Sequence, residues 1–185
     1  MEQTTNNYFA NSQYLKSYQN KSGKYGFINS NDELVIECKY DKVLEFENGF
    51  AGVKLVDKCG FIDTMGKEIC PIKYDAVDNF KNGFAGVVLD DKWGFIDTTG
   101  KEICPVKYDG GYNFENRFAG VNIGGKIDEV GRTIIGGKYG FIDATGKEIC
   151  PIKYDDVKSF ENDGKAKVML NDEIFYIDTT GKEIK

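Results

Sequence analysis

Histidine is absent from the 185 residues, and the chain has only three prolines, one tryptophan and two arginines, Arg117 and Arg132. Histidine is the side chain that most often serves as a general base, a zinc ligand or a pH switch. The sequence also lacks a Walker loop and a dinucleotide fingerprint. We therefore expect no catalytic, metal-binding or cofactor-binding residues and a function that is not enzymatic.

Long apolar runs and an excess of positive charge are also missing. No stretch of about 18 apolar residues is present, so no membrane span is expected. The formal net charge is −6, which argues against binding of nucleic acid through its phosphates. The polar N-terminus has no basic start followed by an apolar run, as a secretory signal would. The five cysteines do not form a compact disulfide framework, so reduced thiols and a cytoplasmic location are expected.

An internal repeat is the main feature of the chain. A segment of the form Lys-aromatic-Gly-Phe-Ile recurs, with Cys59 in the aromatic position of one copy and a weaker copy at Glu173. Its glycines, Gly26, Gly60, Gly94 and Gly140, are separated by steps of 34, 34 and 46 residues. The repeat predicts an array over 23–185, preceded by a polar segment, 1–22, that is flexible or caps the array. The units are about 24–57, 58–91, 92–137, 138–172 and a truncated 173–185.

Each unit has the local features of β-structure. The runs rich in Phe, Ile, Val and Tyr are short and typical of half-buried strands. Asp-x-x-Gly segments such as Asp97 to Gly100, and the Asn-Gly pairs at Asn48 and Asn82, predict tight turns. Inside the array no window has helical periodicity, whereas Tyr14, Leu15 and Tyr18 would fit one or two helical turns between Asn11 and Asn20.

The third unit is written Lys92-Trp93-Gly94-Phe95-Ile96-Asp97, followed by Gly100, Pro105-x-x-Tyr108-Asp109, Phe114 and Ala119-x-Val121. This pattern resembles the bacterial WG repeat, also called KWG, over residues 24 to 185. The resemblance implies a β-repeat scaffold and carries over no catalytic residue. We predict an all-β fold of tandem hairpin repeats of about 34 residues, stacked in an open, twisted array. A closed, propeller-like arrangement is the alternative.

The residues that recur in every unit are interpreted as structural. The aromatic and Phe positions are expected to form the core between repeats, with a row of aromatic ligand pockets as the alternative. Cys70, Cys104 and Cys150 are expected to be small core residues. The tyrosines that precede an Asp, namely Tyr40, Tyr74, Tyr108 and Tyr154, are expected to be buried with their hydroxyls hydrogen-bonded. The Lys-Glu pairs such as Lys147-Glu148 are expected to be solvated. The Asp residues of the Gly turns are expected to bond the backbone, with calcium binding as the alternative.

The largest difference between units is an insertion at 122–137, which is rich in glycine and isoleucine. It is expected to add a short hairpin that projects from the array, with an unrelated loop as the alternative. Such a hairpin exposes backbone edge, to which a partner peptide can add a strand. The residues expected to contact the partner are Arg117, Ile127, Arg132 and Ile134.

The predicted function is that of a scaffold for protein or peptide interaction. A carbohydrate- or cell-envelope-binding module that uses the repeated aromatic residues is the alternative. The ends of an open array need covering. The degenerate last unit with Phe175 is expected to cap one end, and the segment around Tyr14 to Tyr18 the other. An end-to-end homodimer is the alternative way to cover both.

Overall fold

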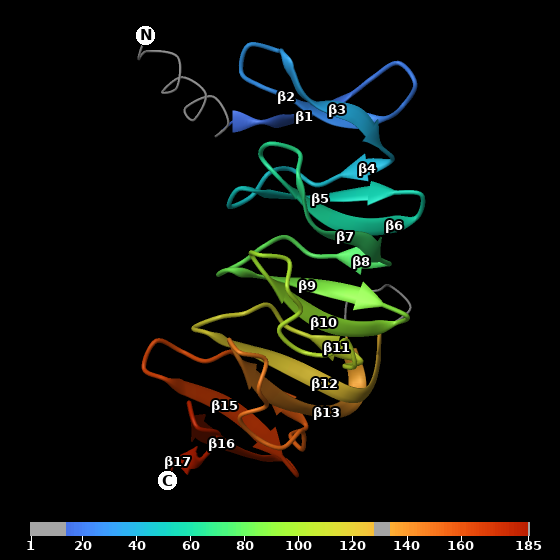
Figure 1. Cartoon of the computed structure of the whole chain (residues 1–185). Helices are drawn as coiled ribbons and strands as arrows, with labels where there is room; N and C mark the ends of the chain where they lie inside the picture. The colour runs from blue at the N-terminus through green and yellow to red at the C-terminus, as the bar shows by residue number, and fades with distance from the viewer. Residues whose placement is uncertain (1–13, 128–133, 185) are drawn as a thin grey trace. The chain divides into compact units, whose positions relative to one another are not determined.

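The structure is a computed structural model that describes residues 14–127 and 134–184 (Figure 1). These residues form two compact units. Unit 1 holds residues 14–80 and the turn Thr98–Lys101, and unit 2 holds residues 81–97 and 102–184. The described residues contain strands and no α-helix. These residues contain no helix that is long and apolar enough to cross a membrane.

Unit 1 is built from small antiparallel sheets. One sheet has the order β1-β2-β3 and another the order β4-β5-β6-β7. The strands are β1 (Lys16–Gln19), β2 (Tyr25–Ile28), β3 (Leu34–Tyr40), β4 (Lys42–Val43), β5 (Phe50–Leu55), β6 (Lys58–Asp63), β7 (Glu68–Tyr74) and β8 (Ala76–Val77).

Unit 2 repeats the same pattern. β9 pairs with β10, and two further antiparallel sheets have the orders β11-β12-β13 and β14-β15-β16-β17. The strands are β9 (Phe84–Leu89), β10 (Lys92–Asp97), β11 (Gly110–Gly111), β12 (Phe118–Ile127), β13 (Ile134–Asp143), β14 (Asp156–Val157), β15 (Lys165–Leu170), β16 (Glu173–Asp178) and β17 (Glu183–Ile184). None of the sheets in the described residues closes into a barrel. The prediction of an all-β fold of tandem hairpin repeats is confirmed.

The core is made by the positions that recur along the sequence. The Phe and Ile positions of the Lys-aromatic-Gly-Phe-Ile segments are almost completely buried, as are the tyrosines that precede an Asp. Each Phe packs on the Phe that precedes the next hairpin, with ring centroids 4.6 to 5.2 Å apart. These pairs are Phe27–Phe46, Phe61–Phe80, Phe95–Phe114 and Phe141–Phe160. The prediction that the recurring Phe residues form the core is confirmed.

The N-terminal segment forms part of the first hairpin. β1 pairs with β2 so that Lys16 lies opposite Ile28, just as Ala51 lies opposite Ile62 in the β5–β6 hairpin. Leu15 is buried in the same cluster as Phe27. The predicted helical turn is therefore wrong for residues 16–19, because pairing with β2 outweighs the weak helical pattern. Asn11 to Gln13 lie outside the described residues.

The Asp-x-x-Gly turns have the predicted geometry. The Oδ1 atom of Asp143 accepts hydrogen bonds from the backbone N–H groups of Thr145 (2.8 Å) and Lys147 (3.2 Å), and Gly146 has φ 81°. Asp63 and Asp178 bond the backbone in the same way. In the described residues, no group of three or more acidic or cysteine side chains is arranged to hold a metal ion.

The turn glycines also let consecutive repeats approach closely. A Cβ atom built on Gly146 would lie 2.6 Å from the carbonyl carbon of Ile103 in the preceding repeat, closer than real Cβ atoms come to other atoms. Gly100 meets Ile69, and Gly181 meets Ile149, in the same way. Glycine is therefore required at these turns both for its positive φ and for the space it leaves.

Candidate functional site

The insertion lengthens an existing hairpin. The hairpins β5–β6, β9–β10 and β15–β16 close with two-residue turns in which both residues have positive φ, as in type I′ turns. In β12–β13 the pair Ile123 and Lys138 takes the place of the last pair before such a turn, and the ladder continues to Ile127 and Ile134. The prediction of an additional hairpin is therefore wrong. The inserted residues replace the turn and continue the same two strands, because their register fits the ladder. We call residues 123–127 and 134–138 the arm (Figure 1).

A buried asparagine holds the base of the arm. Asn122 is fully buried, and its Nδ2 donates to the carbonyl oxygen of Gly136 (3.1 Å) while its Oδ1 accepts from the N–H of Gly125 (3.0 Å). The side-chain amide thus lies between two backbone groups of opposite strands. A Cβ on Gly137 would lie 2.7 Å from the carbonyl oxygen of Ile123, and Gly124, Gly136 and Gly137 all have positive φ. Gly125 and Gly137 make room for this amide, because a Cβ on Gly137 would lie 2.5 Å from Asn122 Oδ1 and one on Gly125 would lie closer still.

One side of the arm packs back on the repeat. Ile134 is half-buried, and a Cβ on Gly110 would lie 2.7 Å from its Cγ1 atom. The other repeats have Lys42, Ala76 and Asp156 at the position of Gly110. The glycine at position 110 therefore makes room for Ile134, and this part of the arm does not project freely.

Two isoleucines of the arm are open to solvent. Ile135 is 63% exposed and Ile123 is 42% exposed. β11 pairs with β12 only at Val121 and Asn122, and the segment after β13 bridges it at Tyr139 and Ile142. Over the arm itself, no strand of the described chain pairs with the outer edge of either strand.

The four predicted contact residues are not brought together. Arg117 precedes the first residue of β12, is exposed, and occupies a turn with φ 73°. Ile127 is the last residue of β12, so the two lie at opposite ends of a strand roughly 30 Å long. Ile134 is turned inward, and Arg132 lies outside the described residues. The insertion is thus kept as the candidate site, without Arg117.

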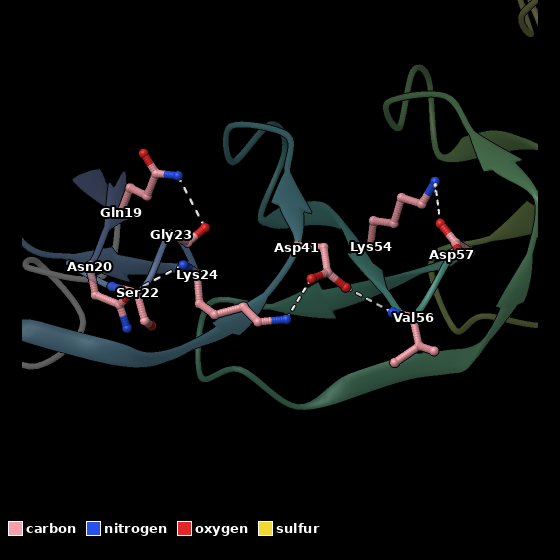
Figure 2. Close-up of polar contacts among 9 residues, drawn as sticks. All are labelled: Gln19, Asn20, Ser22, Gly23, Lys24, Asp41, Lys54, Val56 and Asp57. Atoms are coloured by element: carbon pink, nitrogen blue, oxygen red, sulfur yellow. Dashed lines mark hydrogen bonds and ion pairs between the residues drawn. The ribbon is translucent and has the colours of Figure 1, made fainter.

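Each of the four full repeats contains an ion pair that the sequence analysis missed. Lys24 Nζ lies 2.5 Å from Asp41 Oδ1, and Asp41 Oδ2 accepts the N–H of Val56 (2.8 Å) in the next hairpin turn (Figure 2). The Lys24 ammonium and the Val56 N–H hold the pKa of Asp41 below its usual range. The pairs Lys58–Asp75, Lys92–Asp109 and Lys138–Asp155 repeat the contact. The sequence does contain a signal for these ion pairs. The Lys that begins each Lys-aromatic-Gly segment and the Asp of the following Tyr-Asp pair are separated by a constant number of residues.

Asp109 extends this link to the arm. Its Oδ2 accepts the N–H of Gly124 (2.7 Å), which occupies the position of Val56. The pKa of Asp109 is lowered by Lys92 and by this N–H. The base of the arm is therefore fixed from the β12 side by Asp109 and from within by Asn122.

One carboxylate also reaches the buried tyrosine of the preceding repeat. Glu148 Oε1 accepts from Lys107 Nζ (2.8 Å) and from the Tyr108 hydroxyl (3.2 Å). Glu148 is exposed, as expected, and the stacking of repeats also brings its carboxylate to Tyr108. Burial and Glu148 together raise the pKa of Tyr108. The hydroxyl of Tyr40, by contrast, is buried and has no hydrogen-bond partner among residues 14–127 and 134–184, so the expected hydrogen bond is not seen there.

The thiols and the aromatic row have little exposure. Cys104 and Cys150 are buried, and burial raises the pKa of both thiols, as expected of core cysteines. In the aromatic row, Tyr25 and Trp93 are half-buried and Tyr139 is buried. Tyr139 stacks on Tyr112, with ring centroids 5.8 Å apart. These rings therefore serve mainly as packing surfaces.

Comparisons with known proteins give one assignment. A comparison with curated proteins yields no match. Among solved structures, two of Kluyveromyces lactis Hsv2 are similar at 12% identity, with TM-scores of 0.41 and 0.42. They match over 94% and 90% of this chain, which spans 60% and 58% of theirs. The family model described as "WG containing repeat" matches residues 25–59, 60–93, 93–126 and 139–173. These matches cover most of the chain and leave out residues 127–138, so the chain belongs to the family of WG-containing repeat proteins.

Proposed function

We propose that this chain is a non-catalytic repeat scaffold that binds a protein or peptide through the arm. The observation that carries the proposal is the exposed Ile135 on a hairpin extension whose outer edges pair with no other strand of the described chain. Unpaired strand edges accept further strands, and large apolar side chains on such an edge add affinity. The recurring residues are used for packing, so the arm is the feature left to distinguish a partner.

The side chains available for chemistry support a non-catalytic role. Burial raises the pKa of the thiols of Cys59, Cys104 and Cys150. Raised thiol pKa values keep cysteines protonated and weak as nucleophiles. A surface hollow of about 330 Å³ is lined by Lys165 and Asp163 among other residues. These two side chains form an ion pair, with Nζ and Oδ2 3.0 Å apart. These groups are engaged in structural contacts.

Carbohydrate binding has less support. Sugar-stacking sites present aromatic faces to solvent. Trp93, by contrast, is half-buried and packs against the cluster of buried apolar residues that includes Phe95. Cys59 removes the ring from one position of the row. A glycan array probed with the whole chain tests this alternative, because binding to several glycans at micromolar concentration would favour it over protein recognition.

The test of the proposal is an arm-less variant in which residues 124–137 are replaced by Asn-Asp, the turn found at 171–172. The new turn keeps an N–H for Asp109. A matched variant adds Gly110→Ala, the residue found at position 76, to fill the space left by Ile134. Short random peptides displayed on phage are selected on the wild-type chain, and their affinities are measured by calorimetry.

We expect the arm-less variants to bind the selected peptides at least about tenfold more weakly, while their thermal midpoints stay within a few degrees of the wild type. Unchanged affinity would overturn the proposal. Failure of both variants to fold would also overturn it, because the arm would then be part of the core.

A further inference from the structure

An asparagine in a hairpin turn is bound to the backbone of the following repeat. Asn48 Nδ2 donates to the carbonyl oxygen of Phe80 (3.0 Å), a residue that is almost completely buried. The Phe80 ring packs on Phe50 and Phe61, with ring centroids 4.6 and 4.8 Å apart. We call this hydrogen bond the clasp, because it joins an exposed turn to a core residue of the next repeat. It recurs from Asn82 to Phe114 (2.7 Å) and from Asn116 to Phe160 (2.6 Å).

The residue that follows the asparagine differs between these turns. The pairs are Asn48-Gly49, Asn82-Gly83 and Asn116-Arg117, and all of these residues are exposed. A Cβ built on Gly49 or on Gly83 would meet no atom within 4 Å. The backbone nitrogen after the asparagine is therefore unobstructed in the first two turns, whereas the third has a side chain beside it.

An Asn-Gly pair has a chemical route by which it loses its side-chain amide. The backbone nitrogen of Gly49 attacks the Cγ atom of Asn48, and a C–N bond forms. The Cγ–Nδ2 bond then breaks, and Nδ2 leaves as ammonia with the proton from the Gly49 nitrogen. Water opens the resulting cyclic imide at either of its carbonyl carbons, which yields aspartate or isoaspartate without transfer of electrons. Glycine favours the attack because it has no Cβ beside the nitrogen.

The clasp restrains this reaction in the folded chain. Attack requires the Cγ atom of Asn48 to turn toward the backbone of its own turn, but the clasp holds the amide toward Phe80. Hydrogen bonds in a folded protein are released when their region opens locally, which happens rarely. The reaction therefore proceeds from the open state of the turn.

We propose that Asn48 and Asn82 are sites of spontaneous deamidation, at which hydrolysis releases ammonia and removes the clasp to the next repeat. The carboxylate that forms only accepts hydrogen bonds, so it cannot bond the carbonyl oxygen that the amide held. Isoaspartate also adds a carbon atom to the backbone of a turn that is closed by both hydrogen bonds between Glu47 and Phe50. The modification thus loosens the hold of a turn on the following repeat, and it does not involve the arm.

The test follows each asparagine by peptide mass spectrometry while the whole chain ages in mildly alkaline buffer, either folded or unfolded in urea. Isoaspartate is counted separately by enzymatic carboxyl methylation. Two variants exchange the residue after the asparagine between the two kinds of turn. Arg117→Gly gives Asn116 the residue found at position 49, and Gly49→Arg gives Asn48 the residue found at position 117.

We expect Asn48 and Asn82 in the folded wild type to be modified at least about tenfold faster than Asn116, because no Cβ obstructs the attack. Arg117→Gly should bring Asn116 to the rate of Asn82, and Gly49→Arg should bring Asn48 to the rate of Asn116 in the wild type. Unfolding in urea should accelerate the reaction at Asn48 and Asn82 by about tenfold or more, because it removes the clasp.

The effect of the modification is measured with variants that imitate its product. Asn48→Asp and Asn82→Asp keep a residue that tolerates positive φ and replace the amide by a carboxylate. Asn48→Gly is the control, because it also suits the turn and removes the clasp without adding charge. We expect both aspartate variants to lower the thermal midpoint, and Asn48→Asp to lower it more than Asn48→Gly.

Different results overturn different parts of the proposal. Equal rates at Asn48, Asn82 and Asn116 in the folded wild type would overturn the two sites, as would a folded Arg117→Gly variant whose Asn116 stays unmodified. Rates that do not change on unfolding would overturn the restraint by the clasp. An Asn48→Asp variant as stable as the wild type would overturn the loosening of the next repeat. None of these measurements uses a peptide ligand, so their outcome is separate from that of the proposed function.

Discussion

Val56 is a β-branched residue in a conformation that suits asparagine or glycine. It begins the two-residue turn of the β5–β6 hairpin with φ 48° and is 78% exposed. Asp90 and Asn171 hold the same position in other hairpins. β-Branched side chains are strained at positive φ, so this turn carries a local cost.

We predict that Val56→Asn raises the free energy of unfolding by about 1 kcal/mol. The backbone N–H that bonds Asp41 is retained, so the ion pair in Figure 2 stays intact. Thermal denaturation followed by circular dichroism measures the effect. Met65→Asn, a substitution at an equally exposed apolar residue with negative φ, is the control and should leave the midpoint unchanged. A midpoint that falls with Val56→Asn would contradict the strain argument.

Arg117 gives a second prediction at this scale. It has φ 73° where the corresponding turns have Gly49 and Gly83, and a non-glycine residue there costs about 1 kcal/mol. Arg117→Gly should therefore raise the thermal midpoint. It should leave peptide binding unchanged, because Arg117 lies at the far end of β12 from Ile127. Weaker peptide binding by this variant would restore Arg117 to the contact surface.

Sequence patterns predicted single residues well where the reason was local. The Asp-x-x-Gly turns and the buried Phe row follow from short-range rules, and both are confirmed. Asn122 could not be predicted, because its amide is held by Gly125 and Gly136 from two strands whose pairing the sequence does not state. The contact of Glu148 with Tyr108 was missed for the same reason, since it joins residues of different repeats.

At the scale of elements, glycines separate into those needed for φ alone and those needed for space. Gly49 has φ 88° with no atom within 4 Å of a built Cβ, whereas Gly146 has φ 81° and meets the carbonyl group of Ile103. Both are turn glycines of hairpin repeats. Their substitution therefore isolates the contact between consecutive repeats.

We predict that Gly49→Ala costs about 1 kcal/mol, from the positive φ. Gly146→Ala should cost about 3 kcal/mol or more, because the backbone of the preceding repeat must move. Urea denaturation of both variants measures the difference. Equal losses would show that the approach of Gly146 to Ile103 contributes nothing to stability.

Glycine is needed in the Lys-aromatic-Gly segments for a related reason, which is the space it leaves. A Cβ on Gly60 would lie 3.0 Å from the Cα atom of Ile72 in β7, and Gly94 and Gly140 meet Val106 and Ile152 alike. In the last repeat Phe175 stands at this position and packs against Tyr154. β17 pairs only with Tyr176 and Ile177 of β16. That this last repeat caps the array stays a prediction.

At the scale of the whole molecule, the ion pairs make stability depend on pH. Lysine and backbone N–H groups lower the pKa of Asp41, Asp109 and Asp155 in the folded chain. A carboxyl group with a lowered folded pKa binds fewer protons folded than unfolded, so its stabilisation is present above its unfolded pKa of about 4 and is lost as the pH falls through the folded value. Burial raises the pKa of Asp78, and this shift opposes the trend.

We predict a thermal midpoint that is nearly constant from pH 7 to about pH 5 and falls steeply below about pH 4. Asp109→Asn should flatten this fall, because it removes one of the groups responsible. A midpoint series across the acid range, measured at low salt, checks both statements. A midpoint that rises on acidification would show that the lysine contacts do not form in solution.

The repeat period was sufficient to predict the fold class, because one hairpin pattern recurs with constant spacing and the same core positions. The candidate site was predicted only in part. The length difference located the insertion, but the sequence could not show that it continues β12 and β13, or that Ile134 turns toward Gly110 while Ile135 faces solvent. Both facts depend on pairing and packing between segments that are distant along the chain.

The close approach of turn glycines also has a consequence for how such an array lengthens during evolution. In the first repeat the position of Gly146 is taken by Asp32, which has φ 59° and pairs with Lys16 at 2.8 Å. A duplicated repeat placed before this turn would bring a carbonyl group against the Cβ of Asp32, whereas a duplication between glycine-bearing turns meets no such obstacle. New copies of the repeat can therefore be gained within the array, but one added ahead of Asp32 must await its replacement by glycine.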